Sequence, residues 1–194
     1  FKQKTAYEIS TRDWSSDVCS SDLLIEQYGL VHLSTGDIFR FHLKNETELG
    51  KLAKTFMDQG HLVPDEVTIN MLKGEVLKQK EPKGFIFDGF PRTTPQASAL
   101  DTLLAELGTE ITVMLGLEVE EEELKVRLKQ RALSSGRADD ADPEIIANRI
   151  AVYNRETAPV KNYYEAQDKY VAIDGIGSID SITSRLFSAI DSRK

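Results

Sequence analysis

The segment DGFPRTTPQ, residues 88–96, brings together residue types that bind phosphate, metal and a nucleobase. An acid at the end of a strand can hold a hydrated Mg²⁺, a glycine lets a ligand approach the backbone, and an arginine can donate two hydrogen bonds to a phosphate. The amide of Gln96 offers a paired donor and acceptor, which suits the edge of a purine. Taken singly, Asp88, Gly89 and Arg92 are common residue types, so it is the whole string that predicts a nucleotide site.

Strand-like and helix-like segments alternate from about Leu24 onward, which predicts an α/β fold with a mainly parallel sheet. The run Phe85–Phe87 reads as a short buried strand that delivers Asp88 at its carboxyl end, where ligands bind in such sheets. Further strands are expected at 111–117 and 170–173, and helices at 45–59, from 64 to the turn at 81–84, at 94–107, at 120–132, from 142 onward and at 178–190.

Three other features of the sequence are of types that can take part in catalysis or metal binding. The polar, glycine-containing stretch 134–141 has the composition of a mobile lid. The acidic run EVEEEE at 118–123 is interpreted as a solvated helix start and not as a metal site, because acids favour that end of the helix dipole. His32, His42 and His61 are scattered along the chain without a partner for acid–base or metal chemistry, so all three are interpreted as structural or surface residues.

The composition limits the class of protein. The chain has 194 residues, 40% of them hydrophobic and 29% charged, which suits one globular domain. Its net charge of −8 argues against a general affinity for nucleic acid or an anionic membrane, and its apolar runs are too short for a membrane span. Cys19 is the only cysteine, which excludes an internal disulfide and a multi-cysteine zinc site and suits the cytoplasm.

Five segments, in this order, resemble adenylate kinases of the nucleoside monophosphate kinase family. They are STGDIFR (34–40), ELGKLAKTFMDQGHLVPDE (48–66), GFIFDGFPRTTPQ (84–96), SGRADD (135–140) and NRIAVYNRETAPVKNYY (148–164). The resemblance runs without a gap from about Leu24 to the C-terminus and implies a P-loop NTPase-like, three-layer fold with a parallel sheet between helices. The expected parts are a core at 24–33, 64–129 and 142–194, an AMP-binding lobe at 34–63 and a short lid at 130–141.

The resemblance also implies roles for single residues. AMP is expected to contact Thr35, Arg40, His61, Leu62, Val63, Gly89, Phe90, Pro91, Arg92, Gln96, Arg137 and Arg149. Catalysis is expected to depend on Arg92, Arg131, Arg137 and Arg149, ATP binding on Arg131 and Gly177, and a water-mediated Mg²⁺ contact on Asp88. The short lid contains no cysteine, so no zinc is expected.

The implied reaction is the reversible transfer ATP + AMP = 2 ADP, carried out with Mg²⁺ by a monomeric, cytoplasmic enzyme of adenine nucleotide homeostasis. Thr35 and Thr93 stand where relatives specific for UMP and CMP commonly carry Ala and Asn, which favours AMP as the substrate. Two alternatives stay open: an AMP-binding protein without transferase activity, and a UMP/CMP kinase.

The opening of the chain departs from the family pattern. An apolar strand and a GxPGxGKGT phosphate loop are expected just ahead of the helix that ends at IEQYGL, but the window 11–20 reads TRDWSSDVCS, without glycine or lysine and with two aspartates. Residues 1–22 also lack an apolar run longer than two residues, which is too polar for a strand buried on both faces. We therefore expect the first strand and the P-loop to be missing from residues 1–22, and this chain to be inactive.

Three origins of this opening are possible: a divergent phosphate site, a natural extension and adapter-derived sequence. Nothing in the block can supply backbone amides together with a cation, and an extension would precede the loop and not replace it. The near-repeat SSD-VC-SSDL and the absence of an initiator Met favour an adapter-like, non-native segment at 1–23.

Overall fold

The computed structural model describes residues 5–10, 20–135 and 142–193. The strands are β1 (Thr5–Ser10), β2 (Val31–Ser34), β3 (Gly84–Asp88), β4 (Glu110–Glu118) and β5 (Tyr170–Asp174). The helices are α1 (Ser20–Tyr28), α2 (Thr35–Lys44), α3 (Glu48–Met57), α4 (Asp65–Lys78), α5 (Thr94–Glu106), α6 (Glu121–Ser135), α7 (Pro143–Val152), the π-helical turn η2 (Tyr153–Thr157), α8 (Ala158–Glu165) and α9 (Ile179–Asp191).

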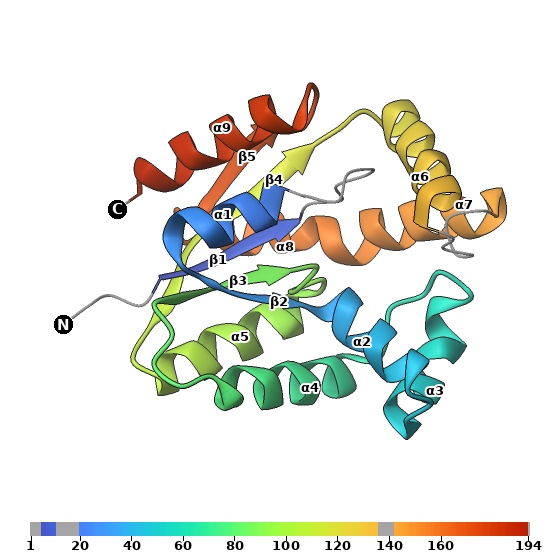
Figure 1. Cartoon of the computed structure of the whole chain (residues 1–194), viewed down its shortest axis with the longest axis horizontal. Helices are drawn as coiled ribbons and strands as arrows, with labels where there is room; N and C mark the ends of the chain where they lie inside the picture. The colour runs from blue at the N-terminus through green and yellow to red at the C-terminus, as the bar shows by residue number, and fades with distance from the viewer. Residues whose placement is uncertain (1–4, 11–19, 136–141, 194) are drawn as a thin grey trace.

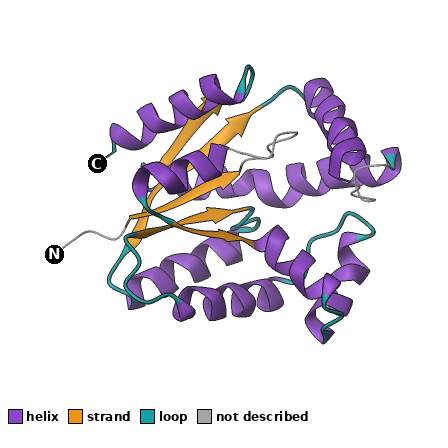
Figure 2. Cartoon of the chain, in the orientation of Figure 1, coloured by secondary structure: helices purple, strands orange, loops and turns teal. Residues whose placement is uncertain are grey.

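The five strands form one sheet in the order β2-β3-β1-β4-β5, and every pairing is parallel. Parallel neighbours need a crossover connection, and helices on both faces of the sheet supply these crossovers (Figure 1, Figure 2). The predicted α/β class and the three-layer arrangement are confirmed.

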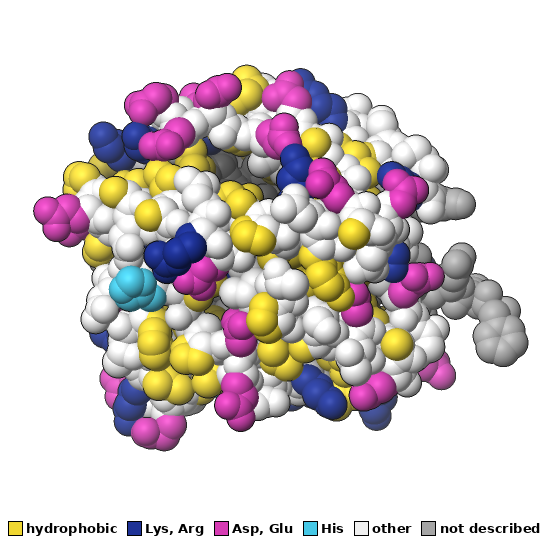
Figure 3. All heavy atoms as spheres, turned by 180° about the vertical axis from the view of Figure 1, so that it is seen from behind, with side chains coloured by type: hydrophobic (Ala, Val, Ile, Leu, Met, Phe, Trp, Pro, Cys, Tyr) yellow, Lys and Arg dark blue, Asp and Glu magenta, His cyan; other side chains and the backbone are white. Residues whose placement is uncertain are grey.

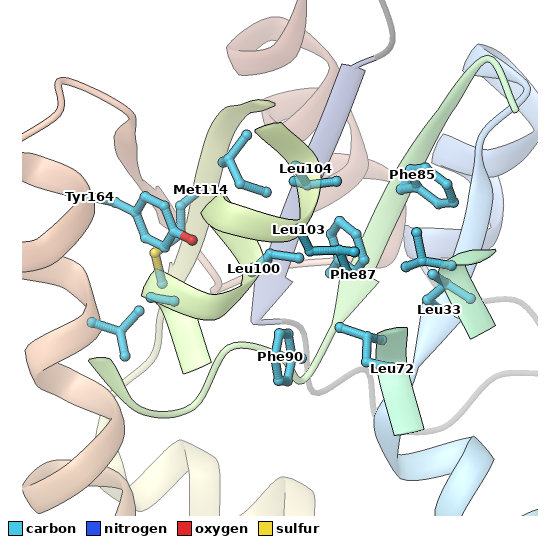
Figure 4. Close-up of a cluster of buried hydrophobic side chains, with 14 residues drawn as sticks. Leu33, Leu72, Phe85, Phe87, Phe90, Leu100, Leu103, Leu104, Met114 and Tyr164 are labelled. Carbon is cyan, nitrogen blue, oxygen red and sulfur yellow. The ribbon is translucent and has the colours of Figure 1, made fainter. Parts of the chain in front are cut away.

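Both faces of the sheet are covered at β3, which explains why this strand is apolar at Phe85, Ile86 and Phe87. On β3, Phe85 and Phe87 belong to a core cluster with α4, α5 and α8, part of which is shown in Figure 4. Ile86, between them, points to the opposite face and packs with residues of α1 and α9. Side chains of successive strand residues alternate between faces, so β3, which is covered on both sides, carries apolar residues in a continuous run.

Residues 5–10 occupy the centre of the sheet as β1, between β3 and β4. An apolar first strand is not expected in residues 1–22, and residues 5–10, TAYEIS, are not an apolar run, yet they pair as a strand. The physical reason is backbone pairing: β3 and β4 each present N–H and C=O groups to the gap between them, and an extended segment of almost any sequence can pair with both. The glycine-rich loop is still missing from the sequence, and its window at 11–19 lies outside the described residues.

Helices α2 and α3 form a small unit beside one end of the sheet (Figure 1). Each helix begins at a hydroxyl cap, Ser34 for α2 and Thr47 for α3. The end of α2 lies so close to α3 that a Cβ atom on Gly50 would lie 2.2 Å from the carbonyl oxygen of His42, so only glycine fits there. An apolar cluster of Phe39, Ala53, Val63 and Met71 packs this unit against α4.

Helices α7 and α8, joined by η2, give the long helical stretch that the sequence predicts beyond Asp142. The side chain of Asp142 caps α7 by accepting a hydrogen bond from the backbone N–H of Glu144 at 2.8 Å. Helix α6 ends at Ser135, and residues 136–141 of the expected lid lie outside the described residues. In the part of the chain that the structure describes, no helix is both long and apolar enough to cross a membrane.

Candidate functional site

The segments STGD and DGFPR meet at the carboxyl ends of β2 and β3. Ser34 pairs in register with Asp88, so the first residue of α2 and the residues after β3 lie at one edge of the sheet. The hydroxyl of Thr35 donates to the carbonyl oxygen of Gly89 at 3.1 Å, and Nε of Arg92 donates to the same oxygen at 2.7 Å. The structure thus brings together three of the residues predicted to hold AMP.

Gly89 lies at the centre of this arrangement. Its φ of +70° lies in the left-handed region that favours glycine, and a Cβ atom there would lie 2.8 Å from Nη2 of Arg92. The next residue, Phe90, is 1% exposed and its ring points into the core (Figure 4). Pro91 is also buried. Of the predicted string, Phe90 and Pro91 therefore offer a ligand little beyond their backbone, while Arg92 keeps a partly exposed side chain.

Gln96 lies in a closed network of polar contacts and is 2% exposed. Its Nε2 donates to Oδ1 of Asp65 at 2.7 Å, and its Oε1 accepts from the backbone N–H of Arg92 at 2.8 Å. The second carboxylate oxygen of Asp65 accepts from the hydroxyl of Thr93 at 2.9 Å. Asp65 is not among the residues predicted for the site, because an acid in the first turn of a helix is common and its partner lies 31 residues away.

Arg40 lies on α2 beside the site and is turned back onto its own helix. It forms a short ion pair with Asp37, one turn earlier. Burial raises the pKa of Asp37, but the hydrogen bond and charge of Arg40 outweigh burial and hold it below its ordinary value. A phosphate bound by Arg40 would therefore compete with Asp37.

The remaining AMP-side residues follow α3. Val63 is buried in the apolar cluster between the α2–α3 unit and α4, Leu62 is half-buried and His61 is exposed. Helix α7 reaches this stretch: Nδ2 of Asn148 donates to the carbonyl oxygen of Gln59 at 2.6 Å. Next to it, the side chain of Arg149 packs against Gly60, since a Cβ atom there would lie 2.8 Å from Cγ of Arg149.

His32 lies next to Asp88, with its Nε2 3.4 Å from Oδ2 of that carboxylate. Within the described residues this buried nitrogen has an ion-pair distance but no well-aligned hydrogen bond. Burial lowers the pKa of His32, but the charge of Asp88, with Asp37 and Asp22 adding to it, outweighs burial and raises it above 6.5. His32 is thus a structural partner of the site, close to the residue predicted to contact Mg²⁺.

The expected ATP side is described only in part. Gly177 has a φ of +123° and lies in the loop between β5 and α9. Sequence reasoning missed Arg127 on α6, which donates from Nη1 to the carbonyl oxygen of Gly175 in the same loop at 3.0 Å. Arg131 lies on α6 one turn further on, but its side chain and the whole of Arg137 lie outside what the structure describes.

Asp88 is the residue to test for a metal. Among the described residues, no group of three or more His, Cys, Asp or Glu could hold a metal ion. Mg²⁺ in nucleotide enzymes usually keeps several waters and uses one or two carboxylates together with substrate phosphates, so it does not need such a group. A single carboxylate at the end of β3, with 22% of its side chain exposed, fits this smaller role.

The comparisons with known proteins agree with this geometry. The family model described as "Adenylate kinase" matches residues 18–169. The adenylate kinase of Flavobacterium psychrophilum is 57% identical over 171 residues, which cover 88% of this chain and 90% of the relative. The adenylate kinase of Flavobacterium johnsoniae is 54% identical over 171 residues, with the same coverage. The adenylate kinase of Bifidobacterium longum is 43% identical over 169 residues, which cover 87% of this chain and 90% of the relative. The resemblance noted in the sequence is confirmed: the chain belongs to the adenylate kinase family of nucleoside monophosphate kinases, which transfer phosphoryl groups between nucleotides.

Proposed function

We propose that the site at the ends of β2 and β3 binds AMP and that the intact enzyme catalyses ATP + AMP = 2 ADP. The observation that carries this proposal is the convergence of Thr35 and Arg92 on the carbonyl oxygen of Gly89. This places a guanidinium beside the N-terminal end of α2, where the helix dipole favours an anion. A phosphate is the anion that such a group of donors suits best.

The arginines would act on the charge of the transferring phosphoryl group. Arg92, Arg131, Arg137 and Arg149 come from three separate parts of the chain, so a phosphate could be neutralised from several sides. The packing of Arg149 against Gly60 supports this role, because it puts α7 next to the expected adenosine-binding stretch, 61–63. Asp88 would hold a hydrated Mg²⁺ that offsets phosphate charge, and no zinc is proposed.

Adenine is the proposed base. Gln96 supplies an amide for its edge, and Thr35 and Thr93 favour AMP over UMP and CMP. The two side-chain contacts of Gln96 support a reading role, because a fixed amide discriminates better than a mobile one. A UMP/CMP kinase remains the less favoured reading of the same site.

The chain as written is proposed to lack transferase activity. Its residues 11–20 contain neither the glycines nor the lysine of a phosphate loop. Removal of one well-placed donor at such a site costs roughly 10²–10³ in rate, so loss of the whole loop should leave only background turnover. The AMP-side residues are all present, so this chain would act as an AMP binder.

Two measurements test the proposal. Titration calorimetry with AMP should show one site per chain, and a coupled assay with ATP, AMP and Mg²⁺ should show no ADP above background. Absence of AMP binding would overturn the proposed site, and clear ADP production would overturn the proposed inactivity.

We propose a monomeric, cytoplasmic protein with ATP, AMP and ADP as its partners. On the face seen in Figure 3, acidic and basic side chains are interspersed. Together with the net charge of −8, this supports a protein without affinity for nucleic acid or membranes.

A further inference from the structure

Asp65 holds the amide of Gln96 from one side while the backbone holds it from the other. The carboxylate can only accept hydrogen bonds, and it accepts one from Nε2 of Gln96 at 2.7 Å. The backbone N–H of Arg92 can only donate, and it donates to Oε1 of the same amide at 2.8 Å. The two ends of the amide are therefore matched to two different partners.

Rotation of the Gln96 amide by 180° would break both contacts at once. The amide oxygen would then face the carboxylate of Asp65, and the amide nitrogen would face the N–H of Arg92. Each would be a repulsive contact in a place where Gln96 is 2% exposed and water cannot take over. Only one orientation of the amide is compatible with this environment.

Asp65 is itself held in place. Its second oxygen, Oδ2, accepts from the hydroxyl of Thr93 at 2.9 Å, and that hydroxyl in turn caps α5 by accepting from the backbone N–H of Gln96 at 3.3 Å. Asp65 is the first residue of α4, so the network also ties the start of α4 to the start of α5. A carboxylate fixed in this way can fix its partner.

The bound amide keeps one N–H and one oxygen lone pair for a ligand. Adenine offers an amino donor at N6 next to an acceptor at N1, whereas hypoxanthine offers an acceptor at O6 next to a donor at N1. An amide that can rotate by 180° would accept either adenine or hypoxanthine, and an amide that cannot rotate would accept only one of the two bases. We propose that Asp65 is a positioning residue that sets the base specificity of the AMP site by fixing the orientation of Gln96; this rests on the AMP site proposed above.

The test compares binding of AMP and IMP by titration calorimetry to the full chain. Asp65→Asn keeps the size of the side chain but allows it to donate as well as accept. Rotation of the Gln96 amide would then create only one repulsive contact, with the N–H of Arg92, instead of two. We expect the affinity for AMP to fall about tenfold and the ratio of AMP to IMP affinity to fall at least fivefold. Glu66→Gln is the matched control, because Glu66 is the exposed neighbour in the same helical turn, and it should change neither value.

A second set of variants separates positioning from loss of structure. In a Gln96→Ala background the Asp65→Asn change should no longer alter the AMP to IMP ratio, because the residue through which it acts is gone. Should Asp65→Asn not fold, Thr93→Val removes the hydroxyl that holds Oδ2, together with the cap of α5, and leaves the Asp65 carboxylate in place; a smaller fall in the ratio is expected.

Each outcome has a distinct meaning. AMP binding by the unaltered chain with an unchanged ratio in Asp65→Asn would overturn the positioning role and leave the AMP site standing. A fall in the ratio that persists in the Gln96→Ala background would overturn it as well. Absence of AMP binding by the unaltered chain would overturn the AMP site, and the positioning role with it.

Discussion

Gly60 and Arg149, far apart in the sequence, pack so closely that a Cβ atom on Gly60 would lie 2.8 Å from Cγ of the arginine. The carbonyl oxygen of Ile145 lies 3.1 Å from the same position, so the glycine is enclosed by backbone as well as by a side chain. Its φ of +71° adds a conformational reason for glycine. This contact joins helix α7 to the end of the α2–α3 unit.

Gly60→Ala should lower the free energy of unfolding by about 2–3 kcal/mol, since it combines an unfavourable φ with a steric clash. Gly108→Ala is the matched control, because Gly108 has a φ of +70° but nothing within 4 Å of its Cβ position. The control should lose only the conformational part, about 1 kcal/mol. Urea unfolding of both variants measures the difference, and equal losses would show that the contact with Arg149 contributes nothing.

The pair of His32 and Asp88 predicts a pH dependence of stability. Burial lowers the pKa of His32, but the neighbouring carboxylates of Asp88, Asp37 and Asp22 outweigh it and raise the pKa above 6.5. The folded state then binds the proton more tightly than the unfolded state. The stabilisation is therefore complete below pH 6.5 and is lost as the pH rises through the raised value.

Chemical unfolding from pH 5.5 to 8.5 tests this prediction. The free energy of unfolding should fall with rising pH in the unaltered chain and fall less in His32→Gln. Asp88→Asn should flatten the profile in the same way, because it removes the nearest charge that His32 faces. The pKa of Asp37 is lowered from 3.8, so its contribution is lost only in acid, outside this window. A slope that both variants retain in full would contradict the role of the pair.

The hydroxyl of Thr35 joins α2 to the turn after β3 by donating to the carbonyl oxygen of Gly89 at 3.1 Å. Thr35→Val keeps the shape of the side chain but leaves this buried region without its donor, at a cost of about 1–2 kcal/mol in stability. AMP affinity, measured by calorimetry, should fall about tenfold as the edge of the site loosens. Thr35→Ser retains the hydroxyl and should bind AMP within about twofold of the unaltered chain; equal loss in both variants would argue against the hydrogen bond.

Much of the fold follows from local patterns in the sequence. The strand at Phe85–Phe87 is apolar at every position because both faces of the sheet are covered, and this leaves a clear signal. Helix α5 begins where Thr93 can cap it, with a proline in its first turn. Such features depend on a few neighbouring residues, so the sequence alone predicts them.

Features that depend on distant partners could not be predicted in this way. The strand β1 forms because the backbone N–H and C=O groups of β3 and β4 face the space between these strands and pair with residues 5–10, whatever the polarity of those residues. The contact of Asp65 with Gln96 and that of Arg127 with Gly175 join residues far apart in sequence. Asp and Arg are both common on helices, so neither Asp65 nor Arg127 stands out in the sequence. Neither contact has a signal within its own segment.

Replacement of residues 1–23 by an apolar strand and a GxPGxGKGT loop should restore phosphoryl transfer. The new strand would occupy the position that β1 already holds between β3 and β4, so the rest of the sheet need not change. The loop would add backbone donors and a lysine, each worth roughly 10²–10³ in rate, and we expect at least a 10³-fold rise in ADP formation over the chain as written. The same chimera with the loop lysine changed to methionine is the control and should lose most of this gain while keeping its AMP affinity. A folded chimera that binds AMP but forms no ADP would show that residues outside the loop also prevent catalysis.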